Sequence, residues 1–137
     1  MNEVLIIIPA FNEEASIGPL LEKLAAPEIS AIADVLVIND ASADMTGFIP
    51  RQYNAATVSH VFNLGYGSAL QLGYKYAVRR KYKFVIQMDA DGQHDVSNVL
   101  KLYERLNQTD ENGKKPDIVI GSRFLSGSVS FPISGVK

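Results

Sequence analysis

The stretch VLIIIPAFNEE, residues 4–14, decides the fold of this chain. Its first five residues are a continuous apolar run that stops at Pro9, which is typical of a strand buried on both faces. Such a strand needs helices on both sides of its sheet, so the run predicts a parallel sheet. Further strands are expected at residues 35–38, 57–62, 82–88 and 117–120.

Segments with helical spacing of apolar residues separate the expected strands. One follows Ser16, a candidate N-cap, and covers residues 17–24; others cover residues 69–78 and 96–106. A short helix interrupted by Pro50 is expected within residues 48–55. The alternation of strand and helix predicts an α/β fold, with a doubly wound, mostly parallel sheet flanked by helices.

Length, charge and composition narrow the possible functions. The 137 residues fit one domain, and a formal net charge of −2 gives no overall attraction to nucleic acid. Cysteine is absent, which excludes a disulfide framework and thiolate zinc sites. No apolar run reaches the length of about 18 residues that a membrane span needs, and the N-terminus lacks a signal-peptide pattern. We therefore expect a cytoplasmic chain.

The stretch FVIQMDADGQHDV, residues 84–96, carries the most specific chemical signal. A strand-like apolar run is followed here by four acidic or imidazole side chains, Asp89, Asp91, His94 and Asp95. Neighbouring carboxylates repel each other unless a cation relieves the repulsion, and carboxylate oxygens are the ligands that Mg²⁺ and Mn²⁺ prefer. The alternative is a solvated turn followed by a helix cap.

The positions of the polar clusters favour the metal site. In doubly wound sheets, ligands bind beyond the carboxyl ends of the strands. The clusters stand where the expected strands end, so five loops are expected to converge on one edge of the sheet. These clusters are residues 9–13, 39–40, 63–67, 89–93 and 121–123.

The same motifs, in this order, resemble those of family 2 glycosyltransferases, and most of all the dolichol- or polyprenyl-phosphate sugar synthases. The resemblance implies the GT-A fold of nucleotide-diphospho-sugar transferases, which is Rossmann-like. It also implies inverting transfer of a sugar from a UDP- or GDP-linked donor to an acceptor such as polyprenyl phosphate. It spans residues 4–124 and rests on PAFNEE (9–14), Asp40 with Ser42, Asp44, Thr46 and Gly47, NLGYG (63–67), MDADGQH (88–94) and GSR (121–123).

The resemblance also implies roles for individual residues. Asp89, Asp91 and Gln93 would hold Mg²⁺ or Mn²⁺ against the diphosphate, and Asp40 would hydrogen-bond the base. Asp91 and Arg123 would be catalytic, with Arg123 reaching the phosphates or the sugar. The implied nucleotide pocket consists of Pro9, Ala10, Phe11, Glu13, Ile38, Asp40, Gly67, Asp89 and Ala90.

Several of these residues have a plain structural alternative. Pro9 could simply end its strand, and Asp40 could cap its own loop. Arg123 could pair with a surface carboxylate, and Gly67 could serve a tight turn. His94 is interpreted as a structural hydrogen-bonding residue, and His60 is assigned no role.

The end of the sequence departs from the family pattern. No Asp or Glu follows Asp117, so no catalytic base is found there, although an ionised acceptor phosphate needs none. We expect residues 1–124 to form the nucleotide-sugar-binding core and residues 125–137 a loop or the start of a missing acceptor-binding part. The sheet is then incomplete at its C-terminal side, and a longer protein would associate with the inner face of the membrane.

Two other function classes compete with a transferase. A dinucleotide oxidoreductase would carry Gly-x-Gly-x-x-Gly directly after the first strand, where Pro9, Ala10 and Phe11 stand instead. A non-catalytic nucleotide-sugar-binding or assembly module remains open, because an incomplete transferase could bind a donor without turnover. An unfinished sheet edge could also pair two copies in a homodimer.

Overall fold

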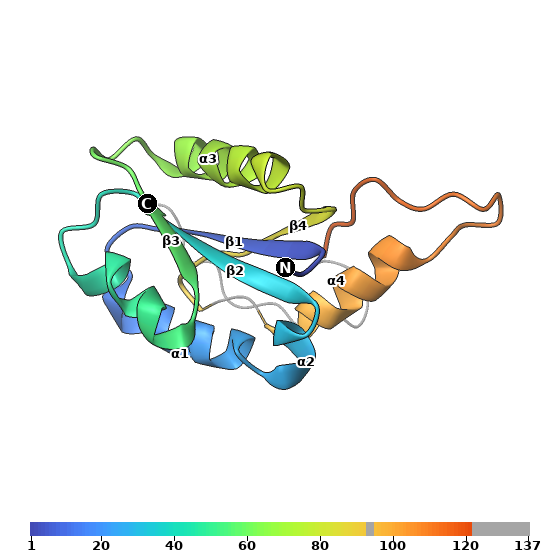
Figure 1. Cartoon of the computed structure of the whole chain (residues 1–137), viewed down its shortest axis with the longest axis horizontal. Helices are drawn as coiled ribbons and strands as arrows, with labels where there is room; N and C mark the ends of the chain where they lie inside the picture. Colours follow the sequence, from blue (N-terminus) through green and yellow to red (C-terminus); the bar gives the residue numbers. More distant parts are fainter. Residues whose placement is uncertain (93–94, 122–137) are drawn as a thin grey trace, which may run out of the picture. The chain divides into compact units, whose positions relative to one another are not determined.

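The computed structural model describes residues 1–92 and 95–121, which fall into two compact units, Met1–Val96 and a second that begins at Ser97. The first unit alternates strands and helices (Figure 1), and the second contains α4 (Ser97–Asn107). The predicted boundary at residue 124 lies outside the described residues. The helices and strands of the first unit are β1 (Val4–Ala10), α1 (Glu14–Leu24), α2 (Pro27–Ser30), β2 (Ala33–Asn39), the 3₁₀ turns η1 (Met45–Gly47) and η2 (Ile49–Tyr53), β3 (Ala56–Ser59), α3 (Tyr66–Arg79) and β4 (Phe84–Gln87).

Within the described residues, four strands form one sheet in the order β3-β2-β1-β4, and every neighbouring pair is parallel. β1 lies between β2 and β4, and all seven of its residues are buried. This agrees with the apolar run that predicted a strand covered on both faces. The predicted fold class, a parallel sheet flanked by helices, is confirmed.

The two faces of the sheet are covered differently (Figure 1). α3 lies on one face, where its small residues Ala69, Gly73 and Ala77 are buried. A Cβ atom on Gly73 would come within 3.1 Å of the side chains of Ile7 and Ile38, so the helix approaches the strands closely because this residue is glycine. α1 and the two 3₁₀ turns lie on the other face, and the apolar side of α1 is buried.

Three local predictions differ from the structure. The predicted strand at residues 117–120 is not formed, and Ile118 and Ile120 are exposed. An apolar run becomes a strand only where a neighbouring strand supplies hydrogen-bond partners. Ser16 is not an N-cap, because α1 already begins at Glu14. The short helix predicted within residues 48–55 is a 3₁₀ turn with Pro50 near its start, where a missing backbone N–H costs nothing.

No helix of the described residues is long and apolar enough to cross a membrane.

Candidate functional site: loops at the carboxyl edge of the sheet

The loops that follow β1, β2, β3 and β4 lie at one edge of the sheet. The strand registers pair Ala10 with Asn39 and Asn39 with Ser59, so β1, β2 and β3 end side by side. The amide of Met88, just after β4, donates to the carbonyl oxygen of Ile7 at 3.0 Å. The convergence predicted from the sequence is therefore present for the four loops that the structure describes.

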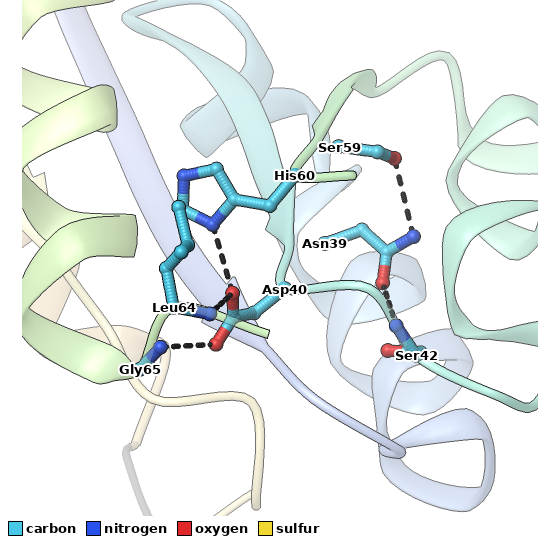
Figure 2. A network of polar contacts seen from close by, with 7 residues as sticks. All are labelled: Asn39, Asp40, Ser42, Ser59, His60, Leu64 and Gly65. Atoms are coloured by element: carbon cyan, nitrogen blue, oxygen red, sulfur yellow. Dashed lines mark hydrogen bonds and ion pairs between the residues drawn. The ribbon is translucent and has the colours of Figure 1, made fainter. Parts of the chain in front are cut away.

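Asp40 is the most deeply buried carboxylate of this edge and holds a distant loop (Figure 2). Only 4% of the residue is exposed. Its Oδ1 accepts hydrogen bonds from Nδ1 of His60 at 2.8 Å and from the amide of Leu64 at 2.9 Å. Its Oδ2 accepts one from the amide of Gly65 at 2.8 Å. Asp40 thus fixes the turn that begins α3, rather than capping its own loop.

The charge of Asp40 is stabilised by these donors. Burial on its own would raise the pKa of this carboxyl group. The hydrogen bonds from Leu64, His60 and Gly65 outweigh burial and hold the pKa of Asp40 below its ordinary value of 3.8. An ionised carboxylate only accepts hydrogen bonds, so Nδ1 of His60 carries a proton. Gly65 has a φ of 93°, a conformation that other residues rarely adopt, and α3 begins at the next residue.

Asn39 joins the neighbouring strand ends on the other side of Asp40 (Figure 2). Its amide nitrogen donates to Ser59 Oγ at 3.1 Å, and its Oδ1 accepts from the amide of Ser42 at 3.0 Å. Between Asp40 and Ser42, Ala41 has a φ of 58°. This left-handed conformation is unfavourable for alanine, so the surrounding hydrogen bonds hold the loop in a strained shape.

The loops after β1 and β2 are tied together through Thr46, which is fully buried. Its Oγ1 accepts from the amide of Glu13 at 2.8 Å and donates to Asp44. Asp44 also accepts a hydrogen bond from the amide of Glu14. Two further hydrogen bonds join the loops: the amide of Asn12 donates to Ser42 Oγ, and the amide of Ala43 donates to Asn12 Oδ1. The hydrogen bond from Thr46 is the largest cause that lowers the pKa of Asp44. The Asp-x-Ser-x-Asp-x-Thr pattern at residues 40–46 therefore shapes the loop that contains Phe11 and Glu13.

Replacing Thr46 with valine tests this connection between the loops. Valine keeps the volume of threonine but leaves the Glu13 amide and Asp44 without this partner, so we expect a loss of about 1–3 kcal/mol in the free energy of unfolding. The matched control is Thr46→Ser, which keeps the hydroxyl and should recover most of the loss. Urea unfolding of the three proteins measures both values. Equal stability of the valine and serine variants would contradict the role of the hydroxyl.

The Asp89-Ala90-Asp91 segment follows β4 and is held from two elements. Ser16 of α1 has its Oγ 2.6 Å from the carbonyl oxygen of Ala90, which is buried. Tyr66 at the start of α3 donates to Oδ1 of Asp89 at 2.8 Å. Asp89 is half-buried, whereas Asp91 is exposed. The segment is therefore an ordered turn whose two carboxylates lie at the edge of the sheet.

These two carboxylates fit a divalent cation that also binds a diphosphate. Among the described residues, no group of three or more His, Cys, Asp or Glu side chains could hold a metal alone. Mg²⁺ and similar ions are commonly held by one or two carboxylates together with substrate phosphates and water, so two protein ligands suffice. The predicted ligand Gln93 and the residue His94 lie outside the described residues, as does Arg123.

The remaining predicted residues are distributed along the same edge. Pro9 and Ala10 end β1 and are buried, and Ile38 is buried in β2. Phe11 is 47% exposed, and Gly67 lies exposed in the first turn of α3. A Cβ atom on Gly67 would meet nothing within 4 Å, so no close contact in the described chain requires glycine there.

Sequence reasoning missed three residues of this edge. From the sequence alone, His60 is assigned no role, Ser16 is interpreted as an N-cap, and Tyr66 is also assigned no role. Their hydrogen-bond partners are 20, 74 and 23 residues away in the sequence. The one signal in the sequence is the place of Tyr66 in the loop after the strand expected at residues 57–62, whereas His60 lies inside that expected strand.

Two cavities of the described residues lie away from the Asp-x-Asp segment. One of about 400 Å³ lies beside β3 and is lined by Asn39, Phe48 and Arg51 among others. Another of about 480 Å³ lies near the first residues of β2 and β3. Neither cavity is lined by Asp89 or Asp91.

The chain is similar to known proteins in sequence and in fold. The chain is 36% identical over 140 residues to an undecaprenyl-phosphate mannosyltransferase of Micrococcus luteus, covering 96% of this chain and 53% of that protein. A mannosyltransferase of Pyrobaculum calidifontis, solved with GDP-Man and Mn²⁺, has a TM-score of 0.54 at 24% identity over 65% of this chain and 27% of that one. The S. aureus protein TarS with UDP-GlcNAc has a TM-score of 0.60 at 25% identity, over 77% of this chain and 32% of that one.

The chain thus spans about half the length of the mannosyltransferase that it resembles in sequence. The family model for glycosyl transferase family 2 matches residues 5–136, which is nearly the whole sequence. This confirms the family predicted from the motifs: the chain belongs to glycosyl transferase family 2.

Proposed function

We propose that this chain is the donor-binding part of an inverting glycosyltransferase that moves a sugar from a nucleoside-diphospho-sugar to a lipid-linked phosphate. The observation that carries the proposal is the position of Asp89 and Asp91, two carboxylates directly after β4 in a segment held by α1 and α3. Support for the substrates comes from the relatives, one named for undecaprenyl phosphate and others solved with GDP-Man or UDP-GlcNAc.

In this proposal Asp89 and Asp91 hold Mg²⁺ or Mn²⁺, with Gln93 as a further ligand. When bound, the metal would act as a Lewis acid that offsets the charge growing on the departing nucleoside diphosphate. Arg123 would add a guanidinium to the same phosphates or to the sugar. An acceptor phosphate is ionised at neutral pH, so it can attack the anomeric carbon without a base from the protein.

The nucleotide would lie over the loops that follow β1 and β2. Phe11, half-exposed beside the buried Pro9 and Ala10, offers a ring for contact with the base or ribose. A carboxylate has about four acceptor positions, and His60, Leu64 and Gly65 occupy three of those on Asp40. One position is left for a donor of the base. Glu13, Ile38 and Gly67 complete the proposed pocket, with Ala90 between the metal carboxylates.

Calorimetry with UDP- and GDP-sugars, with and without Mn²⁺, tests the proposal. The expected result is binding of one donor class that strengthens with Mn²⁺, followed, in a longer protein that also contains an acceptor-binding part, by transfer of the sugar to polyprenyl phosphate. Absence of donor binding under both conditions would contradict the proposal. Mn²⁺-dependent binding without transfer to any lipid phosphate would favour the alternative, a non-catalytic nucleotide-sugar-binding module.

The expected location and assembly remain predictions. A transferase that acts on a lipid phosphate would work at the inner face of the membrane, with its donor site in the cytoplasm. Within the described residues, β3 and β4 are the outer strands of the sheet, and an open strand edge is a place where a second copy could pair. Light scattering of the purified protein distinguishes a monomer from a homodimer.

A further inference from the structure

Four side chains of α3 and β4 form a chain of hydrogen bonds that ends at the first aspartate of the Asp-x-Asp segment. Tyr74 Oη donates to Oε1 of Gln87 at 2.7 Å. Nε2 of Gln87 donates to Tyr66 Oη at 2.9 Å. Tyr66 Oη then donates to Oδ1 of Asp89 at 2.8 Å. These hydrogen bonds thus connect Tyr74, in the middle of α3, to Asp89, a proposed metal ligand.

The donors and acceptors of this chain can be assigned in only one consistent direction. Asp89 as a carboxylate can only accept, so the hydroxyl proton of Tyr66 must point to it. The Tyr66 oxygen is then free to accept, and the only donor that Gln87 offers is its amide N–H. The carbonyl oxygen of Gln87 is left to accept from Tyr74. Each of the four groups therefore has one defined orientation.

The spacing of these residues explains why the chain can form. Gln87 and Asp89 are two positions apart where β4 ends, so in an extended segment they face the same side. Tyr66 and Tyr74 are eight positions apart on α3, which is close to two helical turns and places them on one face of the helix.

We propose that Tyr66 is a positioning residue that fixes the Asp89 carboxylate for divalent-cation binding, with Gln87 and Tyr74 fixing Tyr66 in turn. The inference rests on the proposed function, which assigns the metal to Asp89 and Asp91. Ser16 holds the backbone at Ala90 from α1, while Tyr66 holds the side chain of Asp89 from α3. Groups that orient a metal ligand in this way commonly change metal affinity about 10- to 100-fold.

A purely structural connection between α3 and β4 is the competing explanation. Tyr66 is 51% exposed, and its ring would remain in a Tyr66→Phe variant, so loss of the hydroxyl should change stability little. If the role of Tyr66 is structural, Tyr66→Phe should lower the melting temperature and should lower the nucleotide affinity both with and without metal. If Tyr66 positions Asp89, Tyr66→Phe should lower the Mn²⁺ affinity and leave the melting temperature and the metal-free nucleotide affinity unchanged. These two readouts separate the explanations.

The test measures Mn²⁺ affinity by electron paramagnetic resonance in the full chain saturated with UDP or GDP, whichever of the two binds the wild-type protein more tightly. Tyr66→Phe is expected to weaken Mn²⁺ binding about 10-fold, with melting temperature and metal-free nucleotide affinity unchanged. Tyr74→Phe should give a smaller loss in the same direction. The matched control is Tyr76→Phe on the same helix, because the ring of Tyr76, which the variant keeps, packs against the core and against Arg80. This variant should bind Mn²⁺ normally.

The outcomes distinguish this inference from the proposed function. If the wild-type protein shows no Mn²⁺ binding in the presence of nucleotide, the metal site itself is wrong. If the wild-type protein binds Mn²⁺ and Tyr66→Phe binds it equally well, the positioning role is wrong and the metal site stands. A parallel loss of metal-free nucleotide affinity and melting temperature in Tyr66→Phe would also overturn the positioning role.

Discussion

Replacing Asp91 with asparagine is expected to weaken Mn²⁺-dependent binding of the nucleoside diphosphate by at least about 100-fold, since even residues that only orient metal ligands contribute about 10- to 100-fold. The neutral amide keeps the size of the side chain but removes the negative charge that would balance the cation. Asp91 is exposed, so the substitution should leave the fold intact. Calorimetric titration of the nucleotide with and without Mn²⁺ measures the effect.

The control for Asp91→Asn is Glu22→Gln, which removes the same charge from an exposed position of α1. It should leave both the metal-dependent and the metal-free affinity at wild-type values. The metal-free affinity of Asp91→Asn should also remain, because the base and ribose contacts would come from the loops after β1 and β2. Undiminished Mn²⁺-dependent binding in Asp91→Asn would remove this residue from the metal site.

Replacing Asp40 with asparagine is expected to have the largest effect on stability. The amide of asparagine presents an N–H group where the carboxylate now accepts from the amides of Leu64 and Gly65. At least one backbone N–H then faces another donor in a nearly buried position. A lost hydrogen bond to a charged group costs about 1.5–3 kcal/mol, and we expect a loss of this size in the free energy of unfolding.

The pH dependence gives a second readout for Asp40. Its pKa in the folded chain lies below the ordinary value of 3.8, so its stabilising contribution is fully present above pH 3.8. That contribution is lost as the pH falls below 3.8 and through the pKa of the folded state. The difference in stability between wild type and Asp40→Asn should therefore be constant near neutral pH and shrink in acid. Urea unfolding from pH 3 to pH 7 measures this difference. A stability difference that does not change with pH would contradict a stabilising role for the charge of Asp40.

Much of the fold could be predicted because apolar runs carry the signal for buried parallel strands. The run at residues 4–8 predicted β1, and the run that leads into Asp89 predicted β4 and placed the two carboxylates after a strand end. Residues 118–120 of the strand expected at 117–120 are also apolar, yet no strand forms there. Strand formation depends on a neighbouring chain segment, which a local pattern does not contain.

The candidate site was predictable in its position but not in its hydrogen bonds. Strand ends and motif order placed Asp40, Asp89 and Asp91 on one edge. The partners of Asp40 include the backbone amides of Leu64 and Gly65, and every residue except proline carries such an amide. Their identity therefore gives no hint of the contact.

The most direct test of the central claim is a crystal structure of the protein with Mn²⁺ and a nucleoside diphosphate, using anomalous scattering to locate the metal. The expected result is one manganese peak bound by carboxylate oxygens of Asp89 and Asp91 and by oxygens of the diphosphate. A bound nucleotide with no manganese peak beside these two aspartates would contradict it.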